Sequence, residues 1–501
     1  MVKESDVVII GGGMAGISCA YHLLAASPSN SDKQFSGKVI LVEARDRLGG
    51  RMYGEMIGGS RLELGANWIH GRVGNPVYDL SQELGLSLQK ELDDFGIGSG
   101  RTSDGQNVPR SLVDSVSTVY WSIIEECNKI FHDQRSSNPR GDQRSNEFGS
   151  LGEVVRKRIN DHLATVDEPR KSIEKGLFDC FMNIENVLSS SNSLDELSLQ
   201  YFGAYKEFDK ENHVINGGYN QVYEGLLKRI GSTVPPERFE IILNSPVSRI
   251  DWSSINEQDR KVKVTIENDG SKTIIKCNRI VSTLPLGVLK ANHEQIFHPS
   301  LPEAKRKAIQ SLGFGVVDKI YLEYENNVDK LFDGHSMMTI WSENDKKAAD
   351  WATKIYSLTK INQHTLLAWL TGNEAKRVEK LSPDEVGDHL TKYLRKFTQN
   401  SQFPKPKRVL VTKWASDPYS LGSYSFISID SVHNDIDQLA APIYSTNKKN
   451  ETIDSRPSIL FAGEATHSCF FSTVHGAFIS GKKAALLLNN SDVSSIDSLC
   501  N

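Results

Sequence analysis

The strongest constraint on the fold is a glycine-rich turn close to the start of the chain. A short β-branched apolar run, residues 7–10, leads into Gly11-Gly12-Gly13-Met14-Ala15-Gly16, and residues 17–24 then resemble a helix. In this order glycines give a tight turn, close backbone approach to a pyrophosphate, and close helix-to-strand packing. The pyrophosphate would lie at the helix N-terminus, where free N–H groups favour an anion. The pattern predicts a βαβ unit that binds a dinucleotide.

A second apolar run supports this interpretation. Residues 38–42 end in Glu43, which is placed to accept hydrogen bonds from a ribose diol. Glu43 lies further from the glycines than the roughly 20 residues that are usual for this unit. The excess is a polar stretch, residues 27–37, which we expect to be a surface loop. These features alone fit a nicotinamide dinucleotide as well as a flavin dinucleotide.

Composition excludes several classes of protein. The chain has 501 residues and a net charge of -5, so it is long enough for two or three domains and has no basic excess for nucleic acid. We find no window of about 18 apolar residues, so we expect no membrane span. The six cysteines have no metal-type spacing, so we expect reduced thiols and no metal site. The first strand leaves no room for a signal peptide, and the last residues are not a Ser-Lys-Leu address. We therefore expect a cytoplasmic protein. A peroxisomal location is less expected.

Helical and strand-like patterns alternate along the rest of the chain. Helical spacing dominates residues 111–131 and 151–188, and strand-like runs occur at 239–243, 262–266, 274–276, 280–283, 316–324 and 365–370. A last strand, 458–462, leads into Gly463-Glu464-Ala465 and a helical stretch, 477–488. Like the first unit, this one has an apolar strand that ends at a glycine and an acid. The similarity suggests that the two ends of the chain meet at one cofactor. The middle of the chain would then contain an inserted domain that supplies the substrate side.

Several ordered motifs are similar to those of a known family. They are Leu48-Gly49-Gly50-Arg51, Leu64-Gly65-Ala66-Asn67-Trp68-Ile69-His70-Gly71, Thr283-Leu284-Pro285-Leu286-Gly287-Val288-Leu289, Gly313-Phe314-Gly315-Val316-Val317-Asp318-Lys319, Lys413-Trp414-Ala415-Ser416-Asp417-Pro418-Tyr419, Gly422-Ser423-Tyr424-Ser425, Phe461-Ala462-Gly463-Glu464-Ala465-Thr466-His467 and Ser472-Thr473-Val474-His475-Gly476-Ala477. With them the chain resembles the flavin-dependent amine oxidases, and among these the polyamine oxidases that act on spermine, spermidine and their N1-acetyl forms. The resemblance extends from Val7 to about Leu488.

The resemblance implies an α/β fold. We expect a Rossmann-like FAD-binding domain assembled from residues 1–95, 213–295 and 406–490. An α+β substrate-binding domain, with a mixed sheet flanked by helices, would comprise residues 96–212 and 296–405. We expect residues 491–501 to form a disordered tail.

The cofactor implied by the family is FAD. Arg45 and Arg51 would neutralise the pyrophosphate, Val247 would clamp the adenine through its main chain, and Glu464 would accept a ribityl or phosphate-side hydrogen bond. Related monoamine oxidases link the flavin to a cysteine where this chain has Ser423, so we expect non-covalent FAD. The expected cofactor-binding residues are Gly11, Gly13, Ala15, Gly16, Glu43, Ala44, Arg45, Gly50, Arg51, Gly65, Ala66, Asn67, Trp68, Val247, Gly463, Glu464, Thr473, Val474 and Ala477.

The family also implies a reaction, in which a hydride equivalent leaves the carbon beside a neutral amine and water hydrolyses the resulting imine. O₂ then reoxidises the flavin and yields hydrogen peroxide. Lys319 is the first candidate for catalysis, because relatives use this lysine to hold a water against the flavin. Strand alternation places it with Val317, Tyr321 and Glu323 on one face. His70 resembles a histidine that contacts the substrate amine, and its ordinary pKa near 6.5 suits a proton relay.

The substrate side is implied by other matching positions. Trp414 and Tyr424 would line the substrate tunnel with aromatic faces that attract an amine cation. Monoamine oxidases have a second tyrosine where this chain has Thr473, so Ser472 and Thr473 are expected to contact a substrate nitrogen. Glu185 aligns loosely with an acidic tunnel residue of relatives and would anchor a distant ammonium group.

Three alternatives remain at this stage. A monoamine oxidase is opposed by the missing cysteine, second tyrosine and membrane tail. A flavin histone demethylase is opposed because the glycine motif begins at Val7, which leaves no preceding helical domain. A flavin-binding protein without activity is opposed by the presence of Lys319 and His70. The resemblance favours back-conversion, in which a polyamine is oxidised by O₂ to a shorter polyamine. We expect a monomer or a weak homo-oligomer. The preferred polyamine stays open.

Overall fold

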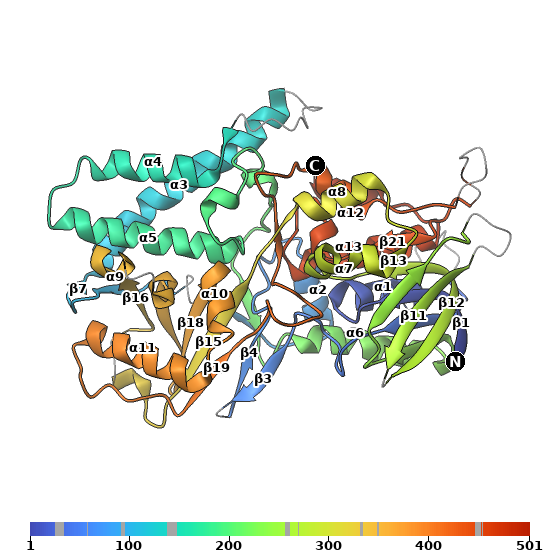
Figure 1. Cartoon of the computed structure of the whole chain (residues 1–501), viewed down its shortest axis with the longest axis horizontal. Helices are drawn as coiled ribbons and strands as arrows, with labels where there is room; N and C mark the ends of the chain where they lie inside the picture. Colours follow the sequence, from blue (N-terminus) through green and yellow to red (C-terminus); the bar gives the residue numbers. More distant parts are fainter. Residues whose placement is uncertain are drawn as a thin grey trace.

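Two β-sheets, each covered by helices, lie side by side in the computed structural model (Figure 1). The structure describes residues 1–25, 35–57, 59–91, 96–137, 148–255, 261–268, 270–330, 334–347, 350–445, 452 and 454–500. Most of the expected surface loop at 27–37 lies outside these residues. In the part of the chain described here, no helix is long and apolar enough to cross a membrane.

The first sheet brings the two ends of the chain together. Its strands follow the order β13-β10-β11-β12-β1-β2-β9, and β21 also pairs with β12. The pairs β1 with β2, β1 with β12 and β12 with β21 are parallel. The bounds of these strands are β1 (Val2–Ile10), β2 (Val39–Val42), β9 (Phe239–Ile242), β10 (Val247–Asp251), β11 (Val262–Asn268), β12 (Ser271–Ser282), β13 (Phe297–His298) and β21 (Ile459–Phe461).

Helices cover both faces of this sheet because β1 is apolar on both faces. Val7 and Ile9 pack into one core, while Val8 and Ile10 pack into the other, as expected for a central parallel strand. A Cβ on Gly481 would lie 2.1 Å from the Ala15 carbonyl oxygen, so α1 and α13 are in close contact. The helices of the first core are α1 (Met14–Leu24), α2 (Pro76–Glu83), α6 (Asn220–Thr233) and α13 (Val474–Leu488), and those of the second are α7 (Leu286–Ile296), α8 (Glu303–Ser311) and α12 (Asn434–Ala440).

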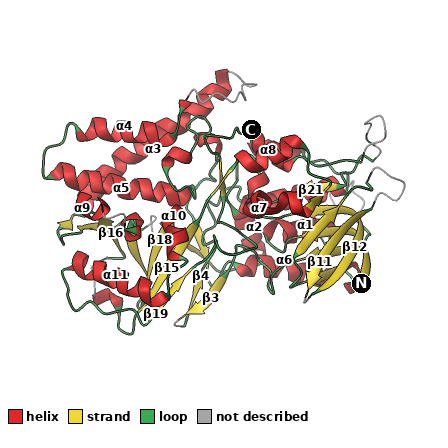
Figure 2. Cartoon of the chain, in the orientation of Figure 1, coloured by secondary structure: helices red, strands yellow, loops and turns green. Residues whose placement is uncertain are grey.

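The second sheet is mixed and carries helices on both faces, as predicted. Its order is β19-β15-β18-β17-β16-β6-β7, and the pair β16 with β6 is parallel among antiparallel neighbours. Its strands are β6 (Ser99–Thr102), β7 (Asn107–Val108), β15 (Val317–Glu323), β16 (Ser336–Ile340), β17 (Ser357–Asn362), β18 (Thr365–Thr371) and β19 (Arg408–Val411). The helices around it, seen on the left of Figure 2, are α3 (Arg110–Ser137), α4 (Leu151–Leu163), α5 (Arg170–Leu188), α9 (Glu343–Lys347), α10 (Gly372–Val378) and α11 (Pro383–Thr398).

Short elements connect the two lobes. The strand β4, paired with β3, ends at Glu63, and the carbonyl oxygens of Glu63 and Gly65 reach Lys319 on β15. The remaining strands pair as β5 with β8 and β14 with β20. The short elements are β3 (Gly54–Ile57), β4 (Ser60–Glu63), β5 (Leu88–Lys90), β8 (His213–Ile215), β14 (Gly313–Phe314), β20 (Ser425–Phe426), α14 (Ser494–Asp497) and the 3₁₀ turns at Leu194–Glu196, Phe202–Ala204, Pro236–Arg238, Val328–Lys330, Trp351–Lys354, Glu464–Thr466 and Ser498–Cys500.

The structure differs from the sequence-based expectation in its element boundaries. The runs 274–276 and 280–283 belong to one long strand, β12, and the helical stretch 151–188 is divided before α5. Strand β13 pairs with β10, and α8 packs into the first lobe, so the first lobe extends beyond residue 295. Strand β19 pairs with β15, so the second lobe extends beyond residue 405. Short strands at domain crossings carry too little pattern to be placed from sequence.

The C-terminal tail was expected to be disordered, and this expectation was wrong for residues 494–500. They form α14 and a 3₁₀ turn, and Ile496 is buried against the first lobe. A disulfide joins Cys500 to Cys469, which also corrects the expectation that all six cysteines are reduced. Cys19, Cys127, Cys180 and Cys277 are free and buried. The apolar side chain of Ile496 and the covalent link at Cys500 therefore hold this segment against the first lobe.

Candidate active site

A large cavity runs between the two lobes. It has a volume of about 1110 Å³ and extends from the glycine turn after β1 to strands β15 and β18 and helix α5. All of the expected site residues line it except Gly16, which lies behind the turn. The sequence-based site is therefore one continuous space in the structure.

The glycine turn forms an open cradle at one end of the cavity. Gly11 has a φ of +105°, and a Cβ there would lie 2.4 Å from Thr283 Oγ1. A Cβ on Gly16 would lie 2.0 Å from the Gly11 carbonyl oxygen, so its role is close helix packing. A Cβ on Gly13 would have no atom within 4 Å, so the N-terminus of α1 opens onto free space. Gly50 lies against Gly13 and has a φ of +57°.

Glu43 closes the end of β2 beside this cradle. Its carboxylate accepts hydrogen bonds from the backbone N–H of Gly12 at 2.6 Å and of Arg45 at 2.9 Å. It is only 4 % exposed. The carboxylate is therefore fixed in place at the end of β2, on the wall of the cavity.

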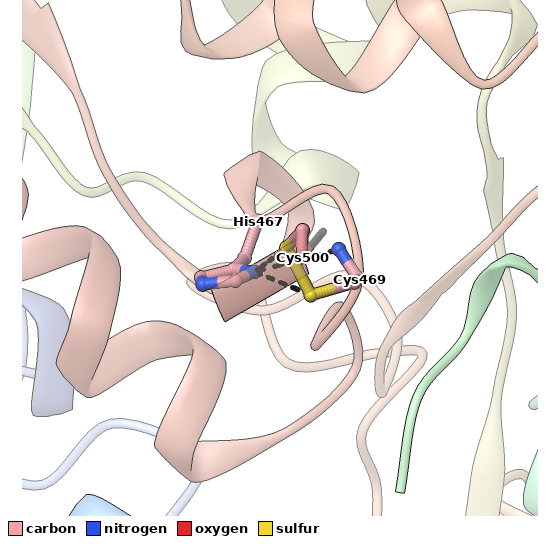
Figure 3. Close-up of side chains that lie close together, drawn as sticks. All are labelled: His467, Cys469 and Cys500. Carbon is pink, nitrogen blue, oxygen red and sulfur yellow. Dashed lines mark hydrogen bonds between the residues drawn. A yellow bond between two sulfur atoms is a disulfide. The ribbon is translucent and has the colours of Figure 1, made fainter. Parts of the chain in front are cut away.

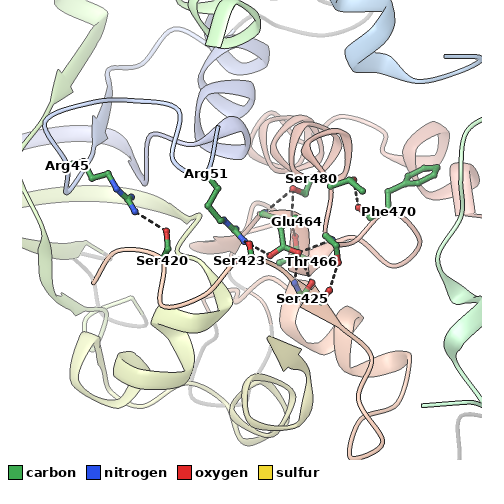
Figure 4. A network of polar contacts seen from close by, with 12 residues as sticks. Arg45, Arg51, Ser420, Ser423, Ser425, Glu464, Thr466, Phe470 and Ser480 are labelled. Carbon is green, nitrogen blue, oxygen red and sulfur yellow. Dashed lines mark hydrogen bonds and ion pairs between the residues drawn. The ribbon is translucent and has the colours of Figure 1, made fainter. Parts of the chain in front are cut away.

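Arg45 and Arg51 hold separate segments at the cavity wall (Figure 4). Arg45 donates from Nη2 to Asp417 Oδ2 at 2.7 Å and to Ser420 Oγ at 2.9 Å. Arg51 donates from Nη1 to the Ser423 carbonyl at 2.6 Å and to Glu464 Oε1 at 3.0 Å. Both guanidinium groups are thus fixed by acids from the C-terminal part of the chain. Their net positive contribution at the pyrophosphate position is reduced by these partners.

Glu464 joins three segments of the cavity wall. Besides Arg51, its carboxylate accepts a hydrogen bond from Ser425 Oγ at 2.6 Å and from the Ser472 backbone N–H at 2.9 Å (Figure 4). Glu464 is 6 % exposed and lines the cavity. The preceding residue, Gly463, has a φ of +139°, which lets the chain turn after β21.

The N-terminus of α13 also faces the cavity. Thr473 caps this helix, because its Oγ1 accepts from the Gly476 N–H at 2.9 Å, and it also donates to the Phe470 carbonyl at 2.7 Å. Ser472 Oγ donates to the Ser425 carbonyl. The two hydroxyl groups expected to contact substrate nitrogen are therefore already used in helix capping and segment linkage. Further lining residues at the expected positions are Ala15, Ala44, Gly65, Ala66, Asn67, Val247, Val474 and Ala477.

Lys319 projects from β15 into the middle of the cavity wall. Its Nζ donates to the carbonyl oxygens of Glu63 at 2.7 Å and Gly65 at 2.8 Å, and lies 4.7 Å from the centroid of the Trp369 ring. It shares a face with Val317 and with Tyr321, whose hydroxyl also donates to Glu63, as alternation predicted. Burial lowers the pKa of Lys319 to about 7. An amine with two N–H groups donated to carbonyls keeps a lone pair for a water when it is neutral.

His70 lies beside Trp68 on the same wall. The two rings are 6.1 Å apart, and Trp68 stacks on Trp369 with centroids 5.7 Å apart. Among the described residues, no hydrogen bond to the His70 ring is present, although its backbone carbonyl accepts from Asn75. Burial lowers the pKa of His70 to about 4, so the ring is neutral at pH 7. The ring can therefore accept a hydrogen bond from a bound amine or donate one to it.

Trp414 and Tyr424 are each fixed by a hydrogen bond from the polar atom of the side chain. Trp414 Nε1 donates to the Leu64 carbonyl at 3.1 Å, and the Tyr424 hydroxyl donates to the Val187 carbonyl. Both side chains line the cavity, Trp414 buried and Tyr424 partly buried. They present their rings rather than their polar atoms to the space.

Two carboxylates lie in the part of the cavity beside α5. Glu185, which was expected, is 5 % exposed, and its Oε1 accepts from Ser189 Oγ at 2.8 Å. Burial, and to a smaller extent the charge of Glu207, raises its pKa to about 7. Burial also raises the pKa of Glu207, which lines the same cavity. Glu207 and Trp369 were missed in the sequence, because neither belongs to a recognisable motif.

The residues present fit a flavin dinucleotide. The free space above Gly13, the buried acid Glu43 at the end of β2 and the open N-terminus of α1 supply the donors and the acceptor that such a group requires. The chain belongs to the family described as flavin containing amine oxidoreductase, whose model matches residues 14–489. It is therefore a flavin-dependent amine oxidoreductase.

The names of similar proteins are consistent with this class of enzyme. The chain is 31% identical to the human peroxisomal N(1)-acetyl-spermine/spermidine oxidase over 509 residues, which cover 96% of this chain and 94% of that protein. It is 29% identical to the Arabidopsis thaliana probable polyamine oxidase 5 over 549 residues, with 97% and 98% covered. The fold is similar to that of a putrescine oxidase bound to putrescine, with a TM-score of 0.67, 17% identity, and 97% and 99% of the chains covered.

Proposed function

We propose that this protein is an FAD-dependent polyamine oxidase of the back-conversion type. It oxidises a secondary amine C–N bond of spermine, spermidine or an N1-acetylated polyamine. The products are a shorter polyamine, an aminoaldehyde and hydrogen peroxide. The named relatives from human and Arabidopsis thaliana support this class of substrate.

One observation carries the proposal. The cavity that begins at the dinucleotide cradle passes Lys319, Trp414 and Tyr424 and continues to the buried carboxylate of Glu185 and the exposed carboxylate of Glu207. A monoamine needs only the aromatic part of this space. Carboxylates set apart from the reacting position suit a substrate with a second ammonium group, because a buried charge needs a partner of opposite sign.

The flavin would supply the acceptor for a hydride equivalent from the carbon beside the amine. The protein contributes orientation and protonation. His70, neutral through burial, accepts a hydrogen bond from the substrate amine, and Trp414 and Tyr424 keep water from the reacting carbon. Lys319, with its pKa near neutrality, holds the water that hydrolyses the imine.

Non-covalent binding of FAD is part of the proposal. Ser423 stands where related enzymes carry a linking cysteine, and its hydroxyl accepts from the Val317 N–H at 2.8 Å and donates to the Val317 carbonyl at 3.0 Å. No cysteine is among the residues of the described chain that line the cavity. Acid precipitation should therefore release all flavin as FAD into the supernatant; yellow colour in the pellet would contradict this.

A peroxide assay with a panel of amines tests the function. Spermine, spermidine, N1-acetylspermine, thermospermine and benzylamine are compared at equal concentration, and the aldehyde products are identified. We expect a polyamine to give the highest kcat/KM, with 3-aminopropanal or 3-acetamidopropanal as product. If benzylamine were the best substrate, the polyamine assignment would be wrong. Products cut on the other side of the inner nitrogen would overturn the back-conversion part alone.

We also propose a cytoplasmic location and a monomer or weak homo-oligomer. The four free cysteines fit a reducing compartment, in which the disulfide between Cys469 and Cys500 would be reversible. The printed name of the human relative is peroxisomal, so imaging of the full chain with organelle markers is the appropriate test. Light scattering at several concentrations measures the oligomeric state.

A further inference from the structure

The C-terminal turn carries a cluster of sulfur and imidazole groups outside the cavity (Figure 3). Cys469 and Cys500 form a disulfide with a Cα–Cα distance of 5.7 Å. His467 Nδ1 lies 3.9 Å from each sulfur atom. Ser468 Oγ also donates towards Cys500 Sγ at 3.3 Å. Both sulfur atoms therefore lie beside the same imidazole nitrogen, and the Ser468 hydroxyl lies beside the sulfur of Cys500.

The state of the imidazole is fixed by the backbone. His467 Nδ1 accepts from the backbone N–H of Phe470 at 3.2 Å and of Cys469 at 3.4 Å. Nδ1 therefore carries a lone pair, and the ring proton is on Nε2. A lone pair beside a thiol accepts its proton and so favours the reactive thiolate.

The cluster differs from every other cysteine in the described chain. Cys19, Cys127, Cys180 and Cys277 are at most 2 % exposed, and burial raises the pKa of each thiol. Cys500 lies on a partly exposed turn, and Cys469 is buried below it. Cys500 is thus the accessible sulfur, and Cys469 is placed to resolve it.

The cluster lies close to the cofactor wall. Cys469 is on the segment that begins with Glu464, bonded to Arg51 and Ser472, and ends with Thr473, the cap of α13. Phe470, which follows Cys469, donates to His467 and accepts from Thr473. A bond at Cys469 therefore ties the C-terminal turn to the segment that lines the cavity.

We propose that Cys469 and Cys500 are a modification site for hydrogen peroxide, the product of the proposed function on which this inference rests. A thiolate attacks one peroxide oxygen, the O–O bond breaks, and a sulfenic acid and water form. The second thiol attacks that sulfur, the S–O bond breaks, and a disulfide and a second water form. Two thiols lose two electrons in all and one peroxide gains them. The bond holds the segment from Glu464 to Thr473 in place and retains the flavin.

The test uses the full-length flavin-loaded protein, reduced with a phosphine and freed of reductant. One equivalent of hydrogen peroxide is added, and thiols are mapped by differential alkylation and mass spectrometry. We expect Cys469 and Cys500 to disappear together as one disulfide while Cys19, Cys180 and Cys277 stay reduced. Equal oxidation of all cysteines, or survival of this pair, would overturn the proposal.

Two variants and one metal test the role of His467. His467→Gln should slow disulfide formation by about tenfold, because it removes the proton acceptor. His298→Gln, an exposed histidine on β13, is the matched control and should have the parent rate. A parent rate in His467→Gln would contradict the proposed reaction. Protection of both cysteines from alkylation by one equivalent of Zn²⁺ would identify a metal site instead.

The same preparation separates this inference from the proposed function. The disulfide should form both with added peroxide and during spermine turnover, and catalase should prevent its formation during turnover. This result supports the modification site and the proposed function. If the disulfide forms with added peroxide but not during spermine turnover, the modification site is supported and the proposed function is contradicted. Reduced protein and Cys500→Ser should release flavin several times faster than the oxidised protein on dilution. Equal release rates would overturn the link to the cofactor.

Discussion

Lys319 on β15 is directly opposite Trp369 on β18, and its Nζ lies 4.7 Å from the centroid of the indole ring. The aromatic face favours a charged amine, whereas burial favours a neutral one. Burial is the larger influence, since it lowers the pKa of Lys319 to about 7. The pair therefore places an amine that changes charge near neutral pH in the wall of the cavity.

Lys319→Met should retain flavin and lose most of its turnover. Loss of a positioned proton-transfer group typically costs about 10²–10⁴-fold in rate. Stopped-flow measurement of flavin reduction and reoxidation shows which half-reaction is slowed, and we expect the oxidative half-reaction and imine hydrolysis to be affected most. Unchanged turnover would remove Lys319 from the catalytic groups.

Lys305 offers a matched control for this change. It is also buried, it donates to the carbonyl oxygens of Gln438 and Leu439, and burial lowers its pKa to about 7. It does not line the cavity. Lys305→Met should therefore leave turnover per bound flavin unchanged, and a loss equal to that of Lys319→Met would point to a general effect of removing a buried lysine.

Lys305 also gives a pH dependence of stability with a definite sign. Its pKa is about 7 in the folded protein and near the ordinary 10.5 in the unfolded chain. Between these values the unfolded chain holds more protons, so its contribution to the free energy of unfolding rises with pH. Below pH 7 both states are charged, and the cost of burial is fully present. Urea unfolding at pH 7 and pH 9 should show a smaller rise for Lys305→Met than for the parent.

Glu185→Gln should raise the KM for spermine with little change in kcat. Its pKa of about 7 means that the carboxylate becomes charged as pH rises through neutrality. The parent KM for spermine should therefore fall from pH 6 to pH 8, and that fall should be weaker in the variant. Steady-state kinetics at both pH values measure the effect. An unchanged KM and pH profile would exclude Glu185 as an anchor.

Glu174→Gln is the control on the same helix. Glu174 is fully buried, but it is paired with Arg170 at 2.6 Å and His162 at 2.9 Å and does not line the cavity. Breaking this ionic group should lower stability by about 1–3 kcal/mol. The KM for spermine should remain that of the parent.

Much of the site could be predicted because it depends on local geometry. The cradle around Gly11 and Gly13 needs residues without a side chain at fixed spacing, and the acid Glu43 must end the next strand. Lys319 was placed on the correct face by strand alternation alone. Such features are visible as short motifs and as the alternation of apolar residues along one strand.

Other parts depend on contacts between distant segments. Trp369 faces Lys319 only because β18 pairs with β15 in one register, and a shift by one residue would turn it away. Glu207 enters the cavity from an irregular segment with no periodic pattern. The bond between Cys469 and Cys500 requires the C-terminal turn to fold back on the first lobe. Spacing in the sequence carries none of this information.

Glu464→Gln tests how the two ends of the chain share the cofactor. The carboxylate accepts hydrogen bonds from Arg51, Ser425 and Ser472. In the variant, Arg51 would lose its charge partner, and the amide N–H groups would face the donors of the two serines. We expect flavin affinity to weaken by about 1–3 kcal/mol, or roughly 5–150-fold in Kd, measured by quenching of FAD fluorescence during reconstitution. Glu343→Gln, which loses an exposed pair with Lys346, is the control and should change neither affinity nor stability measurably. A Kd unchanged in Glu464→Gln would mean that the C-terminal segment holds the flavin through its backbone alone.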